Sequence, residues 1–547
     1  MSSTPLLPSS NHNHNPAHAQ DEGTYFSYVL RSLGLSKASS VQRAGASVSV
    51  VVVVSLFVWV AVEFGAPPPV NVIMLVSDGF GPASQTLARN YNAFIKEAGP
   101  ELRLPLDSIL VGSSRTRSSS SLVTDSAAGA TAFSCALKSY NGAIGVNPEG
   151  VPCGTILEAA KLKGYMTGLV ATSRITHATP ASFSAHVIDR EMEDEIAVQQ
   201  IGNYSLGRMV DLAFGGGSCH FKPQTGSNAG SCRADDLDLL SWGVEKYRWN
   251  ILESVDVFRN LDVTAVSLPL LGLFTPDHMS FEIDRDDTKE PSLKEMAIKA
   301  LDILSYATRR SRKGFFIMIE GSRIDMAAHI NDPAAHVHDI LQYNHLIEAV
   351  IVMISTSDHE TGGLSVAHEL GNVYPDYAWY PEVLRPVQNS TEKIARHLIS
   401  YPNKSALPTY ITETVLPQWL GIKDATKTEL DFLTNPNRTA AEYQEFLGIM
   451  VSDRAGLGWA THGHSAVDVN LYAHGYKSEL LRGNHENTDI GLFMQAVLNV
   501  DLQSVTSRLA AGSWWKEVLG RFNAFSKNIG QSAGYNKLHY HEKTPAL

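Results

Sequence analysis

Four hydrophobic runs in this chain are each followed at once by residue types that bind metal ions or phosphate. In chain order, these residues are Asp78; His177 and Thr179; Glu320, Asp325 and His329; and Asp358 and His359. Imidazole nitrogens and carboxylate oxygens are ligands that zinc takes in proteins, and sets made only of oxygen ligands suit magnesium. The pattern therefore predicts a site that holds several metal ions.

The elements that must position these residues are predicted by the runs themselves. Residues 70–76, 168–172, 315–319 and 350–354 are continuously apolar, which is typical of strands buried on both faces of a parallel sheet. Because strands and helical segments alternate from about 70 to about 366, we expect an α/β fold with a doubly wound, mostly parallel central sheet and helices on both faces. Ligands bind beyond the carboxyl ends of such strands, so all the metal-binding residue types would meet at one edge.

A candidate nucleophile lies in another segment. Ser126 is followed by Ala-Ala-Gly-Ala-Thr-Ala, which predicts a helix that begins near this serine. Free backbone N–H groups and the helix dipole favour an anion at such a position. Taken alone, a serine here is more often structural than catalytic. Its occurrence with the four segments above and with Thr461-His462-Gly463 favours the catalytic interpretation.

The composition excludes one class of partner. The chain has 547 residues, of which 44% are hydrophobic and 18% charged, and its net charge is −12. It is long enough for one large α/β domain with insertions. Binding to nucleic acid, which relies on neutralising phosphates, is not expected of so acidic a chain.

An apolar segment near the N-terminus predicts a membrane anchor. Residues 44–62 are unbroken by charge between Arg43 and Glu63, and at about 1.5 Å per helical residue they span roughly 28 Å, enough to cross a bilayer. A cleaved signal peptide is the alternative, but its apolar region usually lies nearer the N-terminus. With Arg31 and Lys37 also before the segment, the positive-inside rule predicts a single-pass type II protein whose catalytic part is luminal.

This topology divides the chain. We expect a disordered cytosolic tail at 1–43, the transmembrane signal anchor at 44–62, a luminal catalytic domain at 63–510 with a surface insertion at 371–457, and a C-terminal tail of uncertain order at 511–547. All four cysteines, Cys135, Cys153, Cys219 and Cys232, would be luminal, so disulfides are allowed, and we expect Cys219 to pair with Cys232. Glycosylation sequons at Asn203, Asn389, Asn403 and Asn437 fit a secretory route.

Taken together and in this order, the motifs resemble those of the alkaline phosphatase family over roughly 70–500. The segments that carry the resemblance are Ser77-Asp78-Gly79, Thr124-Asp125-Ser126-Ala127-Ala128, Glu320 to His329, Asp358-His359-Glu360 and Thr461-His462-Gly463. Met326, Leu271 to Pro276 and Leu481 to Asn487 make the chain most similar to the fungal vacuolar, repressible, membrane-anchored type. The resemblance implies hydrolysis of small phosphate monoesters, a vacuolar membrane location and a homodimer.

The resemblance also implies two zinc ions and one magnesium ion, with a role for each residue. Asp325, His329 and His462 would hold the first zinc; Asp78, Asp358 and His359 the second; and Asp78, Thr179 and Glu320 the magnesium. Ser126 would form a phosphoserine intermediate, Arg190 would grip the phosphate with its planar fork, and His177 would act near the magnesium through water.

Other residues near the motifs leave alternatives. His464 lies two positions after His462 and is the alternative ligand, whereas Glu360 is expected to support the site rather than bind metal. Close to His329 in the sequence are three further histidines that match no motif and that we expect in loops or at the surface: His336, His338 and His345.

One segment departs from the family pattern. From Leu346 to Ile354 there is no Gly, Pro, Asn, Asp or Ser, although a helix-to-strand return normally needs a loop of about 2 to 6 residues with such breakers. Relative to the family pattern, about a dozen residues are missing here, by natural deletion or by a gene-model error. The strand before Asp358 is then expected to be strained or out of register.

This departure defines the second functional hypothesis. The first is an active zinc-dependent phosphomonoesterase; the second is a catalytically impaired homologue that keeps the fold. A third, a related phosphodiesterase or sulfatase, is disfavoured because those enzymes usually use Thr or a modified Cys as nucleophile and lack the Asp-Ser-Ala-Ala context found at 125–128.

Overall fold

The computed structural model describes residues 70–521 except 225–229, 349, 351–352, 370–373, 375–376, 436 and 512. The tail and anchor expected at 1–62 lie outside the described residues. Within the described part, no helix is both long and apolar enough to cross a bilayer.

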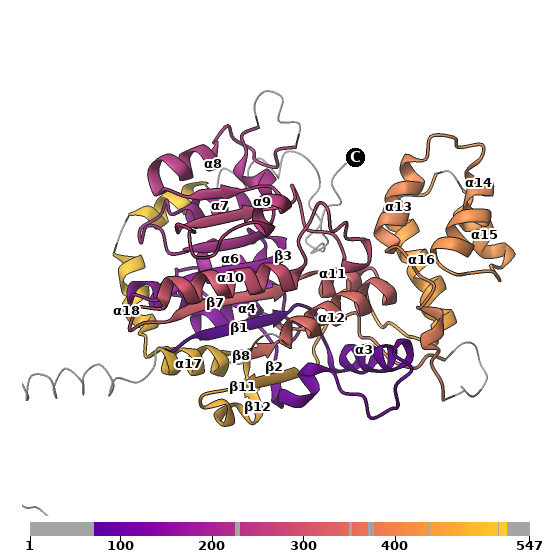
Figure 1. The fold of residues 1–547 in the computed structure, drawn as a ribbon, viewed down its shortest axis with the longest axis horizontal. Coiled ribbons are helices and arrows are strands. Elements are labelled where there is room, and N and C mark those ends of the chain that lie inside the picture. The colour runs from indigo at the N-terminus through magenta and orange to yellow at the C-terminus, as the bar shows by residue number, and fades with distance from the viewer. Residues whose placement is uncertain are drawn as a thin grey trace, which may run out of the picture. The chain divides into compact units, whose positions relative to one another are not determined.

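A ten-stranded sheet forms the centre of the molecule, in the order β12-β2-β11-β8-β1-β7-β3-β4-β6-β5 (Figure 1). All neighbouring strands are parallel except that β11 runs antiparallel to β2 and β8. The strands are β1 Val72–Ser77, β2 Leu110–Arg115, β3 Met166–Arg174, β4 Leu212–Gly216, β5 Asn250–Leu252, β6 Leu270–Leu273, β7 Phe315–Gly321, β8 Met353–Thr356, β11 Val469–His474 and β12 Gly483–Glu486. The expectation of a mostly parallel α/β sheet is confirmed.

The four strands predicted from the apolar runs are neighbours in this sheet, as β8-β1-β7-β3. Their residues alternate between two hydrophobic cores, so that Ile73 and Leu75 of β1 face one core while Met74 and Val76 face the other. Both faces are therefore buried, which explains why these runs show no polar alternation.

Helices cover both faces of the sheet. One core contains residues of α3 (Pro82–Ile95), α9 (Val255–Arg259), α10 (Leu293–Thr308) and α12 (Pro333–Ile347). The other contains residues of α4 (Ser126–Cys135), α5 (Ile156–Leu162), α6 (Ala178–Ser184), α7 (Glu193–Ile201), α8 (Leu239–Trp242), α17 (Asn487–Leu498) and α18 (Leu502–Ala510). A short helix, α11 (Arg323–His329), follows β7, and a two-stranded sheet joins β9 (Glu360–Thr361) to β10 (His464–Ser465).

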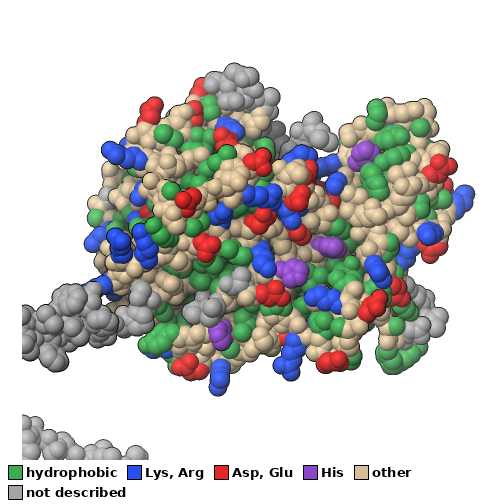
Figure 2. Space-filling view, viewed as in Figure 1, with side chains coloured by type: hydrophobic (Ala, Val, Ile, Leu, Met, Phe, Trp, Pro, Cys, Tyr) green, Lys and Arg blue, Asp and Glu red, His purple; other side chains and the backbone are tan. Residues whose placement is uncertain are grey.

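The segment interpreted as an insertion forms a group of helices set beside α11 and α12, seen on the right of Figure 1. They are α13 (Thr391–Ser400), α14 (Leu407–Tyr410), α15 (Lys427–Leu433) and α16 (Ala440–Ala455), with a π-helical turn at Ile411–Trp419. On the face shown in Figure 2, basic and acidic side chains are interspersed rather than gathered by sign.

Part of the C-terminal segment, whose order the sequence left uncertain, packs against the core. Val518 is only 1% exposed and packs in a cluster with Ala127, Ala178 and Val187, while Trp514 donates its indole N–H to the Leu509 carbonyl at 2.9 Å. Residues of this segment as far as Val518 therefore belong to the packed part of the chain. The sequence here has mixed polarity and gives no clear apolar pattern, because the side chains that pack against the core are few: Trp514, Trp515 and Val518.

Both pairs of cysteines form disulfides. Cys219 bonds to Cys232, as predicted, and Cys135 bonds to Cys153.

The connector before Asp358 is as short as the sequence indicates, but the strand is in place. Helix α12 ends at Ile347 and β8 begins at Met353, three residues later than the apolar run. Ile354, Ser355 and Thr356 pair in parallel with β1, and the same strand pairs with β11 on its other side. The expected loss of register is therefore not found, and the structure gives no support to the impaired homologue.

Candidate functional site

The first part of the site lies between the ends of β1 and β8. Asp78 follows β1, Asp358 and His359 follow β8, and all three side chains are fully buried. The Nε2 atom of His359 lies 3.4 Å from Asp78 Oδ1, 3.3 Å from Asp358 Oδ2 and 3.0 Å from Ser126 Oγ. One nitrogen, two carboxylates and one hydroxyl thus converge on one point.

Ser126 reaches this point because of how its helix begins. Asp125 is the N-cap of α4, accepting the Ala128 N–H at 3.0 Å, and Ser126 is the first helical residue. The expectation of a helix N-terminus is confirmed, with the capping done by Asp125 rather than by the serine. Gly129 allows the close approach, because a Cβ there would lie 2.9 Å from the Cβ of Asp358. The turn after β1 has a similar need, since Gly79 has φ +70° and a Cβ there would lie 2.7 Å from Cα of Asp325.

A second group lies at the end of α11. His329 Nε2 is 3.3 Å from Asp325 Oδ2, and His464 Nε2 is 3.7 Å from Asp325 Oδ1. The two Nε2 atoms lie 3.1 Å apart. Both Nδ1 atoms face backbone carbonyls, that of His462 for His329 and that of Thr124 for His464, so both rings carry their proton on Nδ1. Two Nε2 lone pairs then face each other beside a carboxylate, an arrangement that a cation stabilises.

The structure does not bring His462 to the place predicted for it. Its Nδ1 lies 2.8 Å from the His329 carbonyl oxygen, and within the described residues the groups that converge as a possible metal site include Asp325, His359 and His464 but not His462. The cause is the pairing of β10 with β9, which sets His464 opposite Thr361. The Thr-His-Gly-His sequence contains no signal that favours one histidine over the other, and the geometry favours His464 as the ligand.

The third group lies on the β7 and β3 side. Glu320, the penultimate residue of β7, and Thr179, in α6, are fully buried. Burial raises the pKa of Glu320 to about 7, and Thr179 and Asp78 are among the neighbours that moderate the shift. This arrangement brings together the three oxygen donors that the sequence assigned to magnesium.

Arg190 and His177 lie beside these groups. Arg190 Nη1 is 3.2 Å from Asp125 Oδ2, and its Nη2 is 3.0 Å from His177 Nε2. His177 is the N-cap residue of α6, two positions before Thr179. Asp125 thus both caps the helix of Ser126 and contacts Arg190, a role that sequence reasoning did not assign.

Several carboxylates lie close together in the buried site, and their pKa values are shifted. Burial, followed by repulsion from neighbouring carboxylates, raises the pKa of Asp78 well above its usual value and that of Asp358 to about 7. Burial also opposes ionisation of Asp325, but His329, His464 and His359 hold its pKa well below the usual value. Among the described residues, five buried oxygens of the site make no hydrogen bond of ordinary geometry: Asp78 Oδ1 and Oδ2, Thr179 Oγ1, Glu320 Oε1 and Asp358 Oδ2. Buried oxygens that lack a hydrogen-bond partner are suited to binding cations.

The surrounding residues keep the ligand atoms in place. Glu360 accepts hydrogen bonds from Gly363 and Leu364 N–H, at 3.2 and 3.1 Å, as a structural residue does. His336, expected in a loop or at the surface, is instead fully buried in α12, where it joins Ser84 Oγ to the Ile324 carbonyl at 2.8 and 2.9 Å. His338 and His345 lie on the same helix, half-buried and exposed.

Known proteins are similar to this chain in sequence and in fold. The model of the family described as alkaline phosphatase matches residues 70–500. The chain is 49% identical to an alkaline phosphatase of Schizosaccharomyces pombe over 81% of this chain and 83% of the relative. It is 47% identical to the repressible alkaline phosphatase of Saccharomyces cerevisiae over 80% and 82%. Among solved structures, a cold-active alkaline phosphatase from Shewanella aligns with a TM-score of 0.65 and 29% identity, over 78% of this chain and 100% of that one.

The match covers every segment that supplies the buried carboxylates, histidines and serine described above, from Asp78 to His464. The chain therefore belongs to the alkaline phosphatase family and is a phosphoric monoester hydrolase.

Proposed function

We propose that this enzyme hydrolyses phosphate monoesters through a phosphoserine at Ser126, with two zinc ions and one magnesium ion bound at the three groups of ligands. The observation that carries the proposal is the convergence of Ser126 Oγ, Asp78 and Asp358 on Nε2 of His359. A variant of an Antarctic bacterial alkaline phosphatase, in which one histidine is replaced by glutamate, has magnesium bound in one of its sites; its chain is 26% identical to this one, with a TM-score of 0.55.

The chain's own residues then have these roles. Asp78, Asp358 and His359 would hold one zinc; Asp325, His329 and His464 the other; and Asp78, Thr179 and Glu320 the magnesium. When bound, the metal ions would lower the pKa of a hydroxyl or water and stabilise the charge of the attacking and leaving oxygens. Ser126 Oγ loses its proton and attacks phosphorus, the ester P–O bond breaks and the alcohol leaves with a proton. Water then attacks the phosphoserine, which releases inorganic phosphate and restores the serine hydroxyl. Arg190 offers two parallel N–H donors to the phosphate oxygens, and Asp125 and His177 hold its guanidinium in that orientation.

A comparison of ester classes tests the proposal. We expect the full-length chain, supplied with zinc and magnesium, to release inorganic phosphate from an aryl phosphate monoester much faster than it cleaves the matching diester or sulfate ester. The site binds a dianionic phosphoryl group between Arg190 and the cations, and a diester lacks one of those charges. Turnover that favours the diester would overturn the assignment.

The choice of histidine for the zinc site at Asp325 and His329 gives a sharper prediction. His464→Ala removes an Nε2 that lies 3.1 Å from His329 Nε2, so we expect it to lower zinc content and to reduce kcat/KM by at least about 10²-fold. His462→Ala removes contacts of its Nδ1 with the His329 carbonyl and the Asn331 side chain, and is expected to cost less than about tenfold. Zinc content by mass spectrometry, together with kcat/KM for both variants, decides between them. If His462→Ala loses the metal and His464→Ala keeps it, the original motif-based ligand is correct.

We further propose a single-pass type II protein in the vacuolar membrane, glycosylated and assembled as a homodimer. The apolar segment at 44–62 and the similarity to the fungal repressible enzyme support it. Protease protection in sealed membranes, with probes at each terminus, tests the topology.

A further inference from the structure

Glu193 is not one of the proposed metal ligands, yet its buried carboxylate contacts several side chains near the site. It lies three residues after Arg190. It is the first residue of α7. Its carboxylate accepts hydrogen bonds from Arg174 Nε at 2.9 Å and Arg174 Nη2 at 2.8 Å, and from Thr176 Oγ1 at 2.6 Å. His220 Nε2 lies 3.4 Å away. A bidentate guanidinium and a hydroxyl on one buried carboxylate form a rigid joint.

This joint acts on the segment that carries the magnesium-side residues. Arg174 ends β3, and Thr176 comes directly before His177, with Thr179 two residues further on. Arg174 also reaches Asp277 Oδ1 at 2.6 Å and His278 Nε2 at 2.8 Å, and the His278 ring meets that of His177 edge-on at 5.2 Å. The segment 174–179 is thus held through its side chains from α7 and from the loop at 277–278.

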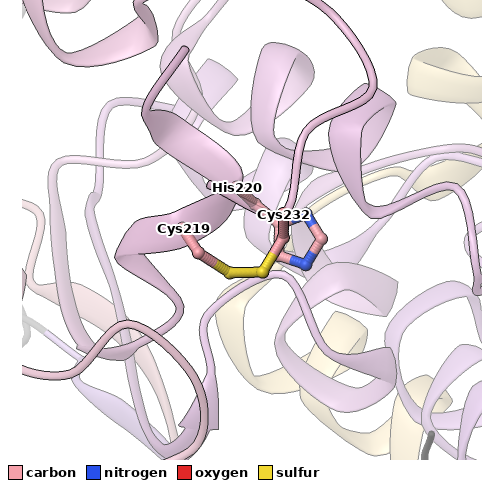
Figure 3. Close-up of side chains that lie close together, drawn as sticks. All are labelled: Cys219, His220 and Cys232. Carbon is pink, nitrogen blue, oxygen red and sulfur yellow. A yellow bond between two sulfur atoms is a disulfide. The ribbon is translucent and has the colours of Figure 1, made fainter. Parts of the chain in front are cut away.

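On another side, Glu193 contacts His220, which lies next to a disulfide-bonded cysteine. His220 Nδ1 lies 3.0 Å from Asp194 Oδ1, so its ring contacts the first two residues of α7. Figure 3 shows this ring beside the disulfide between its neighbour Cys219 and Cys232. Arg233, also buried, donates to the His220 carbonyl at 2.8 Å. The disulfide loop therefore limits the movement of the histidine that backs Glu193.

We propose that Glu193 is a positioning residue that fixes the 174–179 segment against the start of α7, and thereby sets the affinity of the enzyme for magnesium and for phosphate. Arg190 contacts His177 and Glu193 contacts Thr176, so two adjacent residues of the segment are tied to one short stretch, 190–193. Loosening one tie lets the phosphate-binding guanidinium and the magnesium-side residues drift apart. This inference rests on the function proposed above.

The charge state of Glu193 agrees with this role. Burial opposes ionisation, but Arg174 and His220 hold the pKa of the carboxyl well below its usual value. A charged acceptor is therefore present at neutral pH, and an amide in its place would accept from one oxygen only.

The test is Glu193→Gln, with Glu195→Gln as the matched control. Glu195 is in the same helical turn and equally buried, but it pairs with Arg521 at 3.0 Å. On zinc-loaded protein, magnesium binding is measured by calorimetry and binding of inorganic phosphate by equilibrium dialysis. We expect Glu193→Gln to weaken both by about 10-fold or more, with zinc content unchanged, and Glu195→Gln to change both by less than about 2-fold.

Unchanged magnesium and phosphate affinities in folded Glu193→Gln would overturn the inference, as would equal losses in both variants. Should Glu193→Gln not fold, Thr176→Val, which removes a single hydrogen bond to the same carboxylate, is expected to show the same two losses at about 3-fold, and no loss there would overturn it. Because binding is measured without turnover, a protein that binds phosphate normally yet hydrolyses no monoester would contradict the proposed function and leave this inference standing.

Discussion

Ser126→Ala is expected to lower kcat/KM for a phosphate monoester by at least about 10³-fold and to abolish covalent labelling by phosphate. The serine Oγ is the atom that lies 3.0 Å from His359 Nε2, with Asp78 and Asp358 around the same nitrogen. Removing it deletes the nucleophile but leaves the buried carboxylates and histidines in place. Residual turnover is then limited to direct attack by water.

Two measurements check this result. Acid quenching with radioactive phosphate, followed by peptide mapping, shows whether the label is on Ser126 in the wild-type enzyme. Metal content of Ser126→Ala, expected to stay within about 2-fold of wild type, is the control that separates loss of the nucleophile from loss of the site. Wild-type turnover in the variant would show that another residue is the nucleophile.

Removal of metal ions is expected to have the second large effect, a loss of activity of about 10³-fold or more that added zinc and magnesium restore. The physical reason is the set of buried oxygens that, among the described residues, make no hydrogen bond, together with the two facing Nε2 atoms. A free metal concentration about 1,000 times the dissociation constant would stabilise the folded state by about 4 kcal/mol. Dialysis against chelator, with turnover and melting temperature followed together, measures both effects. Chelator-resistant turnover would contradict the metal mechanism.

The metal-free protein should also lose stability as the pH rises. Three buried carboxyls have raised pKa values in the folded state, so the folded protein keeps protons that the unfolded chain has released: Asp78, Glu320 and Asp358. Three buried histidines have lowered pKa values and oppose this below about pH 6.5, where the unfolded chain protonates them: His336, His359 and His464. The net loss therefore falls above about pH 6.5.

The expected result is a lower melting temperature at pH 8 than at pH 6.5 for the metal-free protein. The metal-loaded protein should not show this decline, because cations keep the same carboxylates ionised. A metal-free protein that is more stable at pH 8 would show that the carboxyls do not share one buried site.

The sequence by itself determined the centre of the sheet and the residue types that meet at its edge. Apolar runs without alternation predicted strands buried on both faces, and the four runs became the neighbours β8-β1-β7-β3. Since parallel strands end at one edge, Asp78, Glu320 and Asp358 had to meet there. The position of Ser126 at a helix N-terminus was also predicted from the sequence, because small polar residues are typical of helix starts.

Contacts between distant segments decided the rest. The choice between His462 and His464 depends on a two-residue pairing of β10 with β9 across about a hundred positions. Because residues two apart lie on the same face of a strand, only a shift of two residues in this pair would set His462 in the place of His464. Glu193 and His336 make their contacts with residues of other elements, Arg174 at 19 positions away and Ser84 at 252, so neither has a local sequence pattern around it. A buried strand is recognised from the apolar residues of its own segment. These side chains, by contrast, acquire their roles only when tertiary packing brings a residue from another segment into contact with them.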